Sequence, residues 1–411
     1  MSPYCGIDFG TSNSGVCVGV GNDLRLVPIE GDATTLPSAI FFNTETGQTR
    51  FGRSAMSEYL EGYEGRLLRA LKSVLGTALF KESTQIGSGR KSFHAIIGLY
   101  IAHLKRSAEA FAGQRIEDVV LGRPVHFVDE DPVADQRAED ELRAIAEEQG
   151  FKNIRFEYEP LAAARDFQSR LTGQATILVV DIGGGTSDFS VMRLTATEAQ
   201  ILSNLGVHIG GTNYDKALSL ATAMPDMGFR SLMTNDREMP GLYYHQLSTW
   251  HLINQLYTQK TLLGAKELHY LAQRRDLTQR LINVLEGRYG HDIASRIEAA
   301  KITLSSAETA LADYRHIDKG WHAEISRDTL IAATARDVDR VISTAREAVT
   351  KAGLCPQDIT TLFLTGGSTA LPGFEAAVQA AFPTADISYG DRFASVVQGL
   401  GLAAREAYGQ K

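Results

Sequence analysis

The residues best suited to chemistry surround a run of glycines in the middle of the chain, within the stretch Thr176–Val191. Apolar, mostly β-branched residues lead up to Asp181 and predict a buried strand, and a second apolar run after Asp188 predicts a strand that returns beside it. The turn between them consists of Gly183, Gly184, Gly185 and Thr186. Glycines let backbone N–H groups approach a bulky anion, so this hairpin could cradle a phosphate, with Asp181 beside a magnesium ion. A glycine-rich turn without a ligand is the simpler alternative, because such turns are common.

A second hairpin of the same kind lies near the N-terminus, between Tyr4 and Val20. Its first strand ends at Asp8, and the turn that follows contains Gly10, Thr11, Ser12 and Asn13. Two similar hairpins far apart in one chain indicate two similar lobes. We therefore expect the hairpins to face each other across a cleft and to hold a nucleoside triphosphate between the lobes.

Two more glycine turns lie in the second half of the chain. Gly210 and Gly211 lead into a predicted helix, whose N-terminus could receive a phosphate. The other turn follows the predicted strand 359–364 and contains Gly366, Gly367 and Ser368. It stands at a strand's carboxyl end, where open α/β sheets bind ligands.

Single charged residues are less informative by themselves. Glu298, Lys301 and Ser305 are spaced i, i+3 and i+7, so they share one face of a helix that we predict over 292–311. Such a face is usually solvated, and so is a single lysine such as Lys72. Glu159 stands where a predicted strand leads into a helix of small residues.

These residues must be positioned by the elements around them, and the rest of the pattern alternates strands with helices. Strands are predicted at several places within 24–42 and over 119–125, 154–158 and 359–364. Helices are predicted over 56–76, 92–112, 131–150, most of 250–285, 292–311, 327–352 and 393–407.

Composition limits the class of protein. The chain has 411 residues, which is enough for two or three domain-sized units. Apolar residues make up 44% and charged residues 22%, as in ordinary globular proteins. A net charge of −8 argues against a broad nucleic-acid surface. The three cysteines lack metal-ligand spacing, and we expect Cys5 and Cys17 to be buried in a protein of the reducing cytosol. The sequence shows no signal-peptide pattern and no apolar run of the ~20 residues that span a membrane.

Taken in order, these segments resemble the ATPase domain of the DnaK-type heat-shock chaperones, within the actin–hexokinase superfamily. The segments that carry the resemblance are the two hairpin motifs, Glu159–Ala164, Lys72–Gly76, Gly122–Val125, the helix bearing Glu298, and Gly366–Ser368. The chain is also similar to the YegD branch of short DnaK-like proteins. The resemblance implies an α/β, two-lobed actin-like fold with duplicated ribonuclease-H-like cores. Lobe I would cover 1–173 with an insertion near 35–95, and lobe II would cover 174–411 with a mainly helical insertion near 213–295.

The resemblance also implies a slow, magnesium-dependent ATP hydrolase and a role for each motif. Asp8 and Asp181 would hold hydrated Mg²⁺. Lys72 would neutralise charge near the γ-phosphate, Glu159 would orient or deprotonate the attacking water, and Thr186 would bond the phosphate. The remaining ATP and ADP contacts would come from the hairpin turn residues, from Gly210 and Gly211, and from an adenosine set of Glu298, Lys301, Ser305, Gly366, Gly367 and Ser368.

Two features depart from the DnaK pattern. The arginines that sandwich adenine in that family align with Ile302 and Ala370, and each lost cation–π contact is worth roughly 0.5–2 kcal/mol, so we expect weaker ATP binding and faster ADP release. The chain ends at Lys411 without the linker and peptide-binding domain of the chaperones. We therefore expect a nucleotide-dependent conformational switch for an unidentified protein partner or co-chaperone rather than a self-contained peptide chaperone.

Other functions are possible on the same fold. A kinase of a sugar or small acid would need a substrate pocket beside the γ-phosphate. An actin-like filament protein would need polymer interfaces, for which the sequence gives no clear signal. A nucleotide-binding module without activity is disfavoured, because the residues expected to hydrolyse ATP are all present: Asp8, Lys72, Glu159, Asp181 and Thr186.

Overall fold

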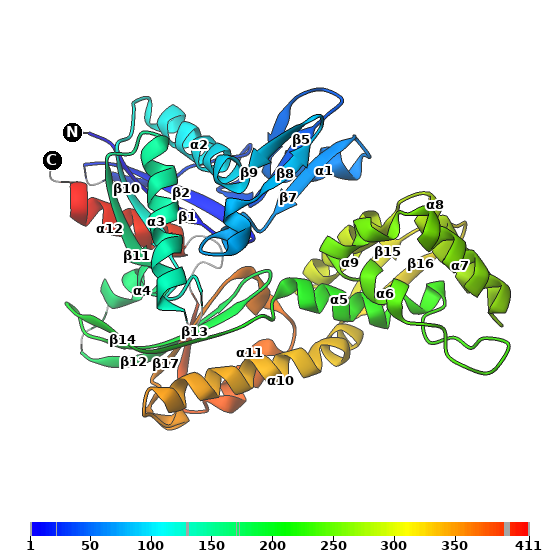
Figure 1. Ribbon diagram of the computed structural model, residues 1–411. Helices are drawn as coiled ribbons and strands as arrows, with labels where there is room; N and C mark the ends of the chain where they lie inside the picture. The colour runs from blue at the N-terminus through cyan, green and yellow to red at the C-terminus, as the bar shows by residue number, and fades with distance from the viewer. Residues whose placement is uncertain are drawn as a thin grey trace.

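Two mixed β-sheets form the centres of two lobes in the computed structural model, which describes residues 2–21, 23–128, 131–169, 171, 173–389 and 395–409 (Figure 1). The first sheet has the order β11-β10-β1-β2-β3, with β4 paired to β2, and the second has the order β14-β13-β12-β17-β18. Each contains an antiparallel hairpin, β1–β2 or β12–β13, whose first strand pairs in parallel with a strand from later in the chain. This repeated plan is the duplicated core expected from the two hairpin motifs.

The first lobe is built in layers around its sheet. Its strands are β1 Tyr4–Phe9, β2 Asn13–Val20, β3 Asp23–Leu26, β4 Thr35–Pro37, β10 Asp118–Arg123 and β11 Asn153–Tyr158. Alternate residues of β1 point to opposite faces. Ile7 and Phe9 pack against helices α2 Phe93–Ala112 and α3 Pro132–Glu148, whereas Tyr4 packs against α12 Ser395–Tyr408. The sheet is therefore covered on both faces.

The second lobe repeats this layering. Its strands are β12 Ala175–Ile182, β13 Ser187–Leu194, β14 Ala199–Val207, β17 Thr361–Thr365 and β18 Asp386–Tyr389. Leu178 and Val180 face the larger core with α10 Arg327–Lys351, while Ile177 and Val179 face α4 Glu159–Ser169. Figure 1 shows α10 along one side of this sheet, with α11 Phe374–Ala381 beside it. The helix α5 Gly211–Ala221 leads from the sheet toward the outer part of the lobe.

Each lobe carries an insertion on the same side of the molecule (Figure 1). The first insertion contains β5 Ala39–Asn43, β6 Thr49–Phe51, α1 Gly52–Leu60, β7 Gly65–Arg69, β8 Ser83–Ile86, β9 Gly89–Ser92 and the 3-10 helices Leu71–Val74 and Ala78–Lys81. The second contains α6 Leu242–Leu247, α7 Gln259–Leu271, α8 Arg275–Glu286, α9 Gly290–Leu304, β15 Thr309–Asp313, β16 His322–Ser326 and the 3-10 helices Pro225–Met227 and Trp250–Leu256. Short 3-10 helices also cover Pro356–Asp358 and Gly367–Ala370.

The helices α4 and α12 cross each other between the two sheets. A Cβ atom added at Gly399 of α12 would lie 1.9 Å from the Ala162 carbonyl oxygen, so only glycine permits this approach. Helix α12 packs on β1, β2 and β10, which belong to the first sheet. The last described helix therefore lies with the first lobe, although its residues fall within 174–411, the range that we predict for lobe II from the sequence.

Several sequence predictions of elements are confirmed and two are wrong. The helices that begin after Ser92 and Asp131 are present, and both side chains cap the helix N-terminus. The predicted helix over 56–76 is instead α1, β7 and a 3-10 helix, because Gly62 has φ +89° and ends the helical run. The predicted helix over 292–311 ends at Leu304, and its last residues form β15, which pairs with β16.

The remaining general expectations concern the cysteines and the membrane. Cys5 and Cys17 are buried free thiols, as predicted. No helix in the described part of the chain is long and apolar enough to cross a membrane.

Candidate nucleotide site

The first hairpin places Asp8 at the end of β1, directly before the turn. The register pairs Asp8 with Gly15 and Phe9 with Ser14. Ser38, the residue between β4 and β5, fixes the tip of the hairpin: its Oγ donates to the Gly10 carbonyl oxygen at 2.6 Å, and its N–H donates to the Ser12 carbonyl oxygen at 2.8 Å. Thr11 and Ser12 are therefore held in a fixed turn.

The second hairpin has the same geometry and gathers the other glycine turns around it. Asp181 pairs with Asp188 across the strands, and the Gly183 N–H closes the turn on the Thr186 carbonyl oxygen at 2.9 Å. The Gly183 carbonyl oxygen also accepts from the Gly211 N–H at 3.0 Å and from Ser368 Oγ at 2.9 Å. The structure thus brings three sequence-predicted turns together: Gly183–Gly185, Gly210–Gly211 and Gly366–Ser368.

The two hairpin tips meet. A Cβ atom added at Gly184 would lie 2.1 Å from Ser12 Oγ, so the backbone of one turn rests against the side chain of the other. This contact joins the first lobe to the second where the sequence predicts the phosphates of a nucleotide. Backbone N–H groups in such turns form anion-binding concavities.

Buried Lys72 and half-buried Glu159 form an ion pair beside the hairpins. Lys72 lies in the 3-10 helix Leu71–Val74 of the first insertion, and Glu159 is the first residue of α4. Burial opposes the charged ammonium, but the Glu159 and Asp8 carboxylates outweigh it and raise the pKa of Lys72 above its usual value. A lysine that the sequence alone would leave on the surface is thus a fixed, buried cation.

Asp8 and Asp181 lie in surroundings that disfavour their charged forms. Burial raises the pKa of Asp8 to about 7, and the Glu159 carboxylate adds to this effect while Lys72 opposes it. Burial, followed by the charges of Asp188 and Glu159, raises the pKa of Asp181 to about 8. Carboxylates that resist ionisation in this way would be stabilised by a nearby cation.

The donor set fits hydrated Mg²⁺ better than a metal enclosed by protein. Among the residues that the structure describes, no three His, Cys, Asp or Glu side chains form a metal cage. Mg²⁺ usually keeps several waters and is held through one or two carboxylates together with substrate phosphates. Asp8 and Asp181, at the ends of equivalent strands, are suited to that role.

The predicted adenosine residues lie on the second lobe and are only partly brought together. Lys301 Nζ contacts Asp215 Oδ1 at 2.7 Å and donates to the Gly211 carbonyl oxygen at 3.3 Å, which ties α9 to the glycine turn. Glu298 lies one turn earlier on α9 and adds negative charge near Asp215. Ser305 is exposed at the end of the helix, where its Oγ bonds the Ile302 carbonyl oxygen at 2.6 Å.

Comparison with known protein families agrees with this geometry. A family model described as Hsp70 protein matches residues 4–224 and 271–389, which is most of the chain. The chain belongs to the Hsp70 family. The matched stretches contain both hairpins, and the two-lobed actin-like ATPase fold expected from the sequence is confirmed. ATPase domains of Hsp70 proteins bind ATP and ADP. Residues 225–270, between the matched stretches, include α6, the 3-10 helix Trp250–Leu256 and most of α7.

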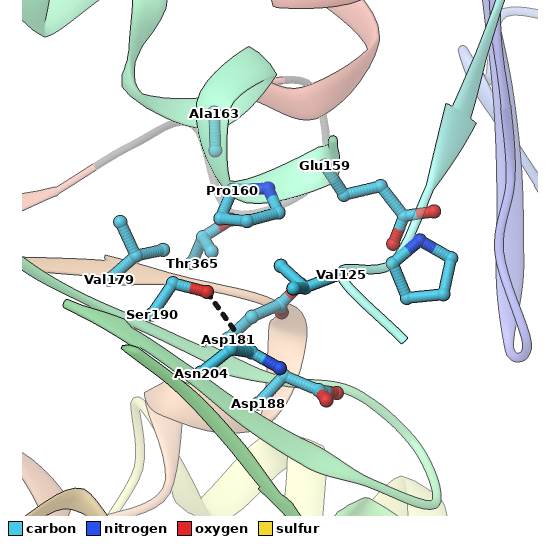
Figure 2. A pocket seen from close by; sticks show the side chains of 11 residues that line it. Val125, Glu159, Pro160, Ala163, Val179, Asp181, Asp188, Ser190, Asn204 and Thr365 are labelled. Atoms are coloured by element: carbon cyan, nitrogen blue, oxygen red, sulfur yellow. Dashed lines mark hydrogen bonds between the residues drawn. The ribbon is translucent and has the colours of Figure 1, made fainter. Parts of the chain in front are cut away.

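A small cavity in this Hsp70 protein lies beside the catalytic candidates (Figure 2). Its volume is about 30 Å³, enough for a water molecule, and Glu159, Asp181 and Asp188 border it. On the far side, Ser190 donates to Asn204 at 2.7 Å.

Sequence reasoning missed some residues around the Hsp70 nucleotide site. Ser38 and Asn204 belong to no motif, and Asp215 was not identified as the partner of Lys301. Asp215 could have been found, because it stands one helical turn after Gly211 and so faces the same site. Ser38 reaches the hairpin because β4, which directly precedes it, pairs with β2, and this pairing leaves no local signal in the sequence.

Proposed function

We propose that this Hsp70-family protein hydrolyses ATP slowly and uses the bound nucleotide as a conformational switch for a protein partner. The observation that carries the proposal is the Lys72–Glu159 pair, with Lys72 buried, beside two phosphate-type hairpins whose tips meet. Phosphoryl transfer depends on positioning and on charge neutralisation more than on covalent help from the protein. A fixed cation and a fixed carboxylate at this point supply both.

In the proposed reaction, water attacks the γ-phosphorus of ATP, the bond to the β–γ bridging oxygen breaks, and ADP, phosphate and a proton leave. Glu159 would orient the water and receive its proton. Lys72 would stabilise charge on the γ-phosphate, with Thr186 and the hairpin N–H groups as further donors. Mg²⁺ bound with the nucleotide would neutralise phosphate charge, and Asp8 and Asp181 would hold its waters.

The space beside Glu159 can hold an attacking water. The cavity that Glu159 borders has a volume of about 30 Å³, enough for one water molecule. A small-molecule kinase is the alternative function on this fold. A screen of sugars and acids for phosphate transfer would reveal the kinase function if it exists.

The switch is supported by the position of Glu159. It begins α4, the helix that crosses α12 between the two sheets, and it is bonded to the first insertion through Lys72. Loss of the γ-phosphate would change the charge balance at this point, where elements of both lobes meet.

Single-turnover hydrolysis of ATP with Mg²⁺ tests the proposal. We expect slow hydrolysis by the wild type and a loss on the order of 100-fold in Lys72→Met and in Glu159→Gln, which remove one positioned group each. Glu157→Gln is the matched control, because Glu157 lies near the end of β11, two residues before Glu159, but pairs with Arg165 instead. Binding of ATP with no hydrolysis by the wild type would contradict the proposal.

A further inference from the structure

Arg123 is a buried cation at the end of β10, next to the candidate site but outside its predicted set. Its exposed fraction is 7%, and Pro124 follows it directly. A buried guanidinium is costly unless carboxylates and hydrogen-bond acceptors surround it. Its contacts therefore indicate what it holds in place.

The guanidinium donates hydrogen bonds to two carboxylates of α3 and to two backbone carbonyl oxygens. Its NH2 atom contacts Asp135 at 2.7 Å, and its NH1 atom donates to Glu139. Nε donates to the Pro124 carbonyl oxygen at 3.1 Å, and NH2 donates to the Val125 carbonyl oxygen at 3.3 Å. Arg123 thereby ties the loop after β10 to α3.

The guanidinium also lies between two aromatic rings. Its central carbon is 5.2 Å from the ring centre of Phe127 and 5.2 Å from that of Tyr158. Tyr158 is the partner of Arg123 in the parallel pairing of β10 with β11, and it directly precedes Glu159. Arg123 thus contacts both the loop and the residue that leads into α4.

The groups that Arg123 holds form one wall of the cavity in Figure 2. Pro124, Val125 and Glu159 line that wall, opposite Asp181 and Asp188 of the second lobe. A Cβ atom added at Gly122 would lie 3.3 Å from Glu159 Cγ, so the Glu159 stem also packs on the strand that ends at Arg123. A small shift of β10 would move the Glu159 carboxylate.

We propose that Arg123 is a positioning residue for Glu159. It fixes the end of β10, the Pro124–Val125 loop and the start of α4, so that the Glu159 carboxylate stays against Lys72 and faces the attacking water. This inference rests on the proposed ATP hydrolysis. Lysine cannot replace Arg123, because an ammonium lacks the planar fork that serves two carboxylates and two carbonyls at once.

The test compares Arg123→Lys and Asp135→Asn with Arg143→Met as the control. Arg143 resembles Arg123 in pairing with Glu139 and in lying over an aromatic ring, that of Phe156, but it contacts neither the loop nor Tyr158. The single-turnover rate, the Kd for Mg·ADP and the melting temperature are measured for each variant. The melting temperature identifies variants that do not fold.

We expect Arg123→Lys to lower the hydrolysis rate on the order of 10- to 100-fold, because displacements near 1 Å have such effects. The Kd for Mg·ADP should change less than about threefold, since Arg123 does not face the hairpins, and Asp135→Asn should give a smaller loss in the same direction. Arg143→Met should hydrolyse like the wild type. A wild-type hydrolysis rate in Arg123→Lys, or equal losses of hydrolysis rate and ADP affinity in that variant, would overturn this inference but not the proposed function. An inactive wild type would overturn the proposed function and this inference with it.

Discussion

Two regions where the lobes meet, which we call the base and the mouth, are held together by different chemistry. At the base, charged groups dominate: Lys72 and Glu159 are paired, and Asp8 and Asp181 face them as carboxyls with raised pKa values. At the mouth, which we define as Tyr59 and Arg69 of the first insertion with Trp250, Asn254 and His291 of the second, aromatic contacts dominate. The base is arranged for reaction, and the mouth for holding the insertions together.

The mouth consists of a short chain of contacts. The Tyr59 hydroxyl donates to Asn254 Oδ1 at 3.1 Å and lies 3.2 Å from His291 Nδ1. The His291 ring meets the Trp250 ring at 4.6 Å, and the Arg69 guanidinium lies 4.7 Å from the Trp250 ring centre. Two of these residues, Trp250 and Asn254, fall in the stretch between the two parts matched by the Hsp70 family model. The base thus lies within the stretches that the Hsp70 family model matches, whereas part of the mouth lies outside them.

The mouth is electrostatically connected to the predicted adenosine side. Burial raises the pKa of Asp215 to about 6, while Lys301 and, from the other insertion, Arg69 lower it. Arg69 therefore acts on both Trp250 and the Asp215–Lys301 pair. We expect variants at the base to alter the chemical step and variants at the mouth to alter nucleotide release.

The largest effect should come from combining changes at the base. Lys72→Met with Glu159→Gln should lose about as much hydrolysis rate as either single variant, on the order of 100-fold, because groups that act as a unit are not additive. Single-turnover rates of the wild type, the two single variants and the double variant complete the double-mutant cycle. Multiplicative losses would show that the two side chains act independently and that their ion pair has no catalytic role.

A pH effect on stability should also originate at the base. In the nucleotide-free protein, Asp181 and Asp8 have pKa values of about 8 and about 7, against an ordinary value of 3.8. Between about pH 4 and pH 8 the folded protein therefore binds more protons than the unfolded chain, and its free energy of unfolding falls as pH rises. Melting temperatures without metal should fall over this range. The melting temperature of Asp181→Asn should fall less over this range and should exceed that of the wild type at pH 8. The difference between the two proteins should shrink toward pH 4. Parallel curves for the two proteins would contradict the raised pKa of Asp181.

At the mouth, Trp250→Ala should speed ADP release without changing hydrolysis. It removes the contact with Arg69, worth roughly 0.5–2 kcal/mol, which corresponds to about 2- to 30-fold in rate. Stopped-flow release of a fluorescent ADP measures it. Tyr270→Ala is the control, because this aromatic residue of the same insertion is 69% exposed. Equal release rates in the two variants would show that the mouth does not limit release.

The smallest effect should come from Tyr59→Phe, which keeps the ring and removes the hydroxyl. A net hydrogen bond is worth about 0.5–1.5 kcal/mol, so release should quicken by about 2- to 10-fold. Burial lowers the pKa of His291 to about 4, so this ring stays neutral and the effect should be constant between pH 5.5 and pH 8. A release rate that changes steeply in that range would indicate a titrating His291.

The sequence predicts the two hairpins of the base because each hairpin is local. Each hairpin contains its own strands, turn and aspartate within about twenty residues, and the structure pairs Asp8 with Gly15 and Asp181 with Asp188 accordingly. The roles of Lys72, Glu159 and the adenosine residues in catalysis and binding stay predictions, as do the lobe boundary and the weakened adenine site. Ile302, at one of those adenine positions, is 60% exposed and free of the core.

The mouth could not be predicted, since its contacts depend on how two insertions meet. Tyr59 and Asn254 are separated by 195 positions, and no spacing relates them. The same limit explains the error over 56–76, where β7 forms only because β5 is present to pair with it. It also explains α12, whose helical pattern is evident but whose place on the first sheet depends on the distant β1.

The position of α12 has a consequence for how the chain is made. The ribosome releases the first sheet long before residues 395–408, so one face of β1, β2 and β10 stays uncovered during nearly all of synthesis. Contacts between residues this far apart form slowly, and exposed strands in the meantime are prone to aggregation. A nascent chain arrested before α12 should therefore be sensitive to protease in the first lobe, while the completed chain resists.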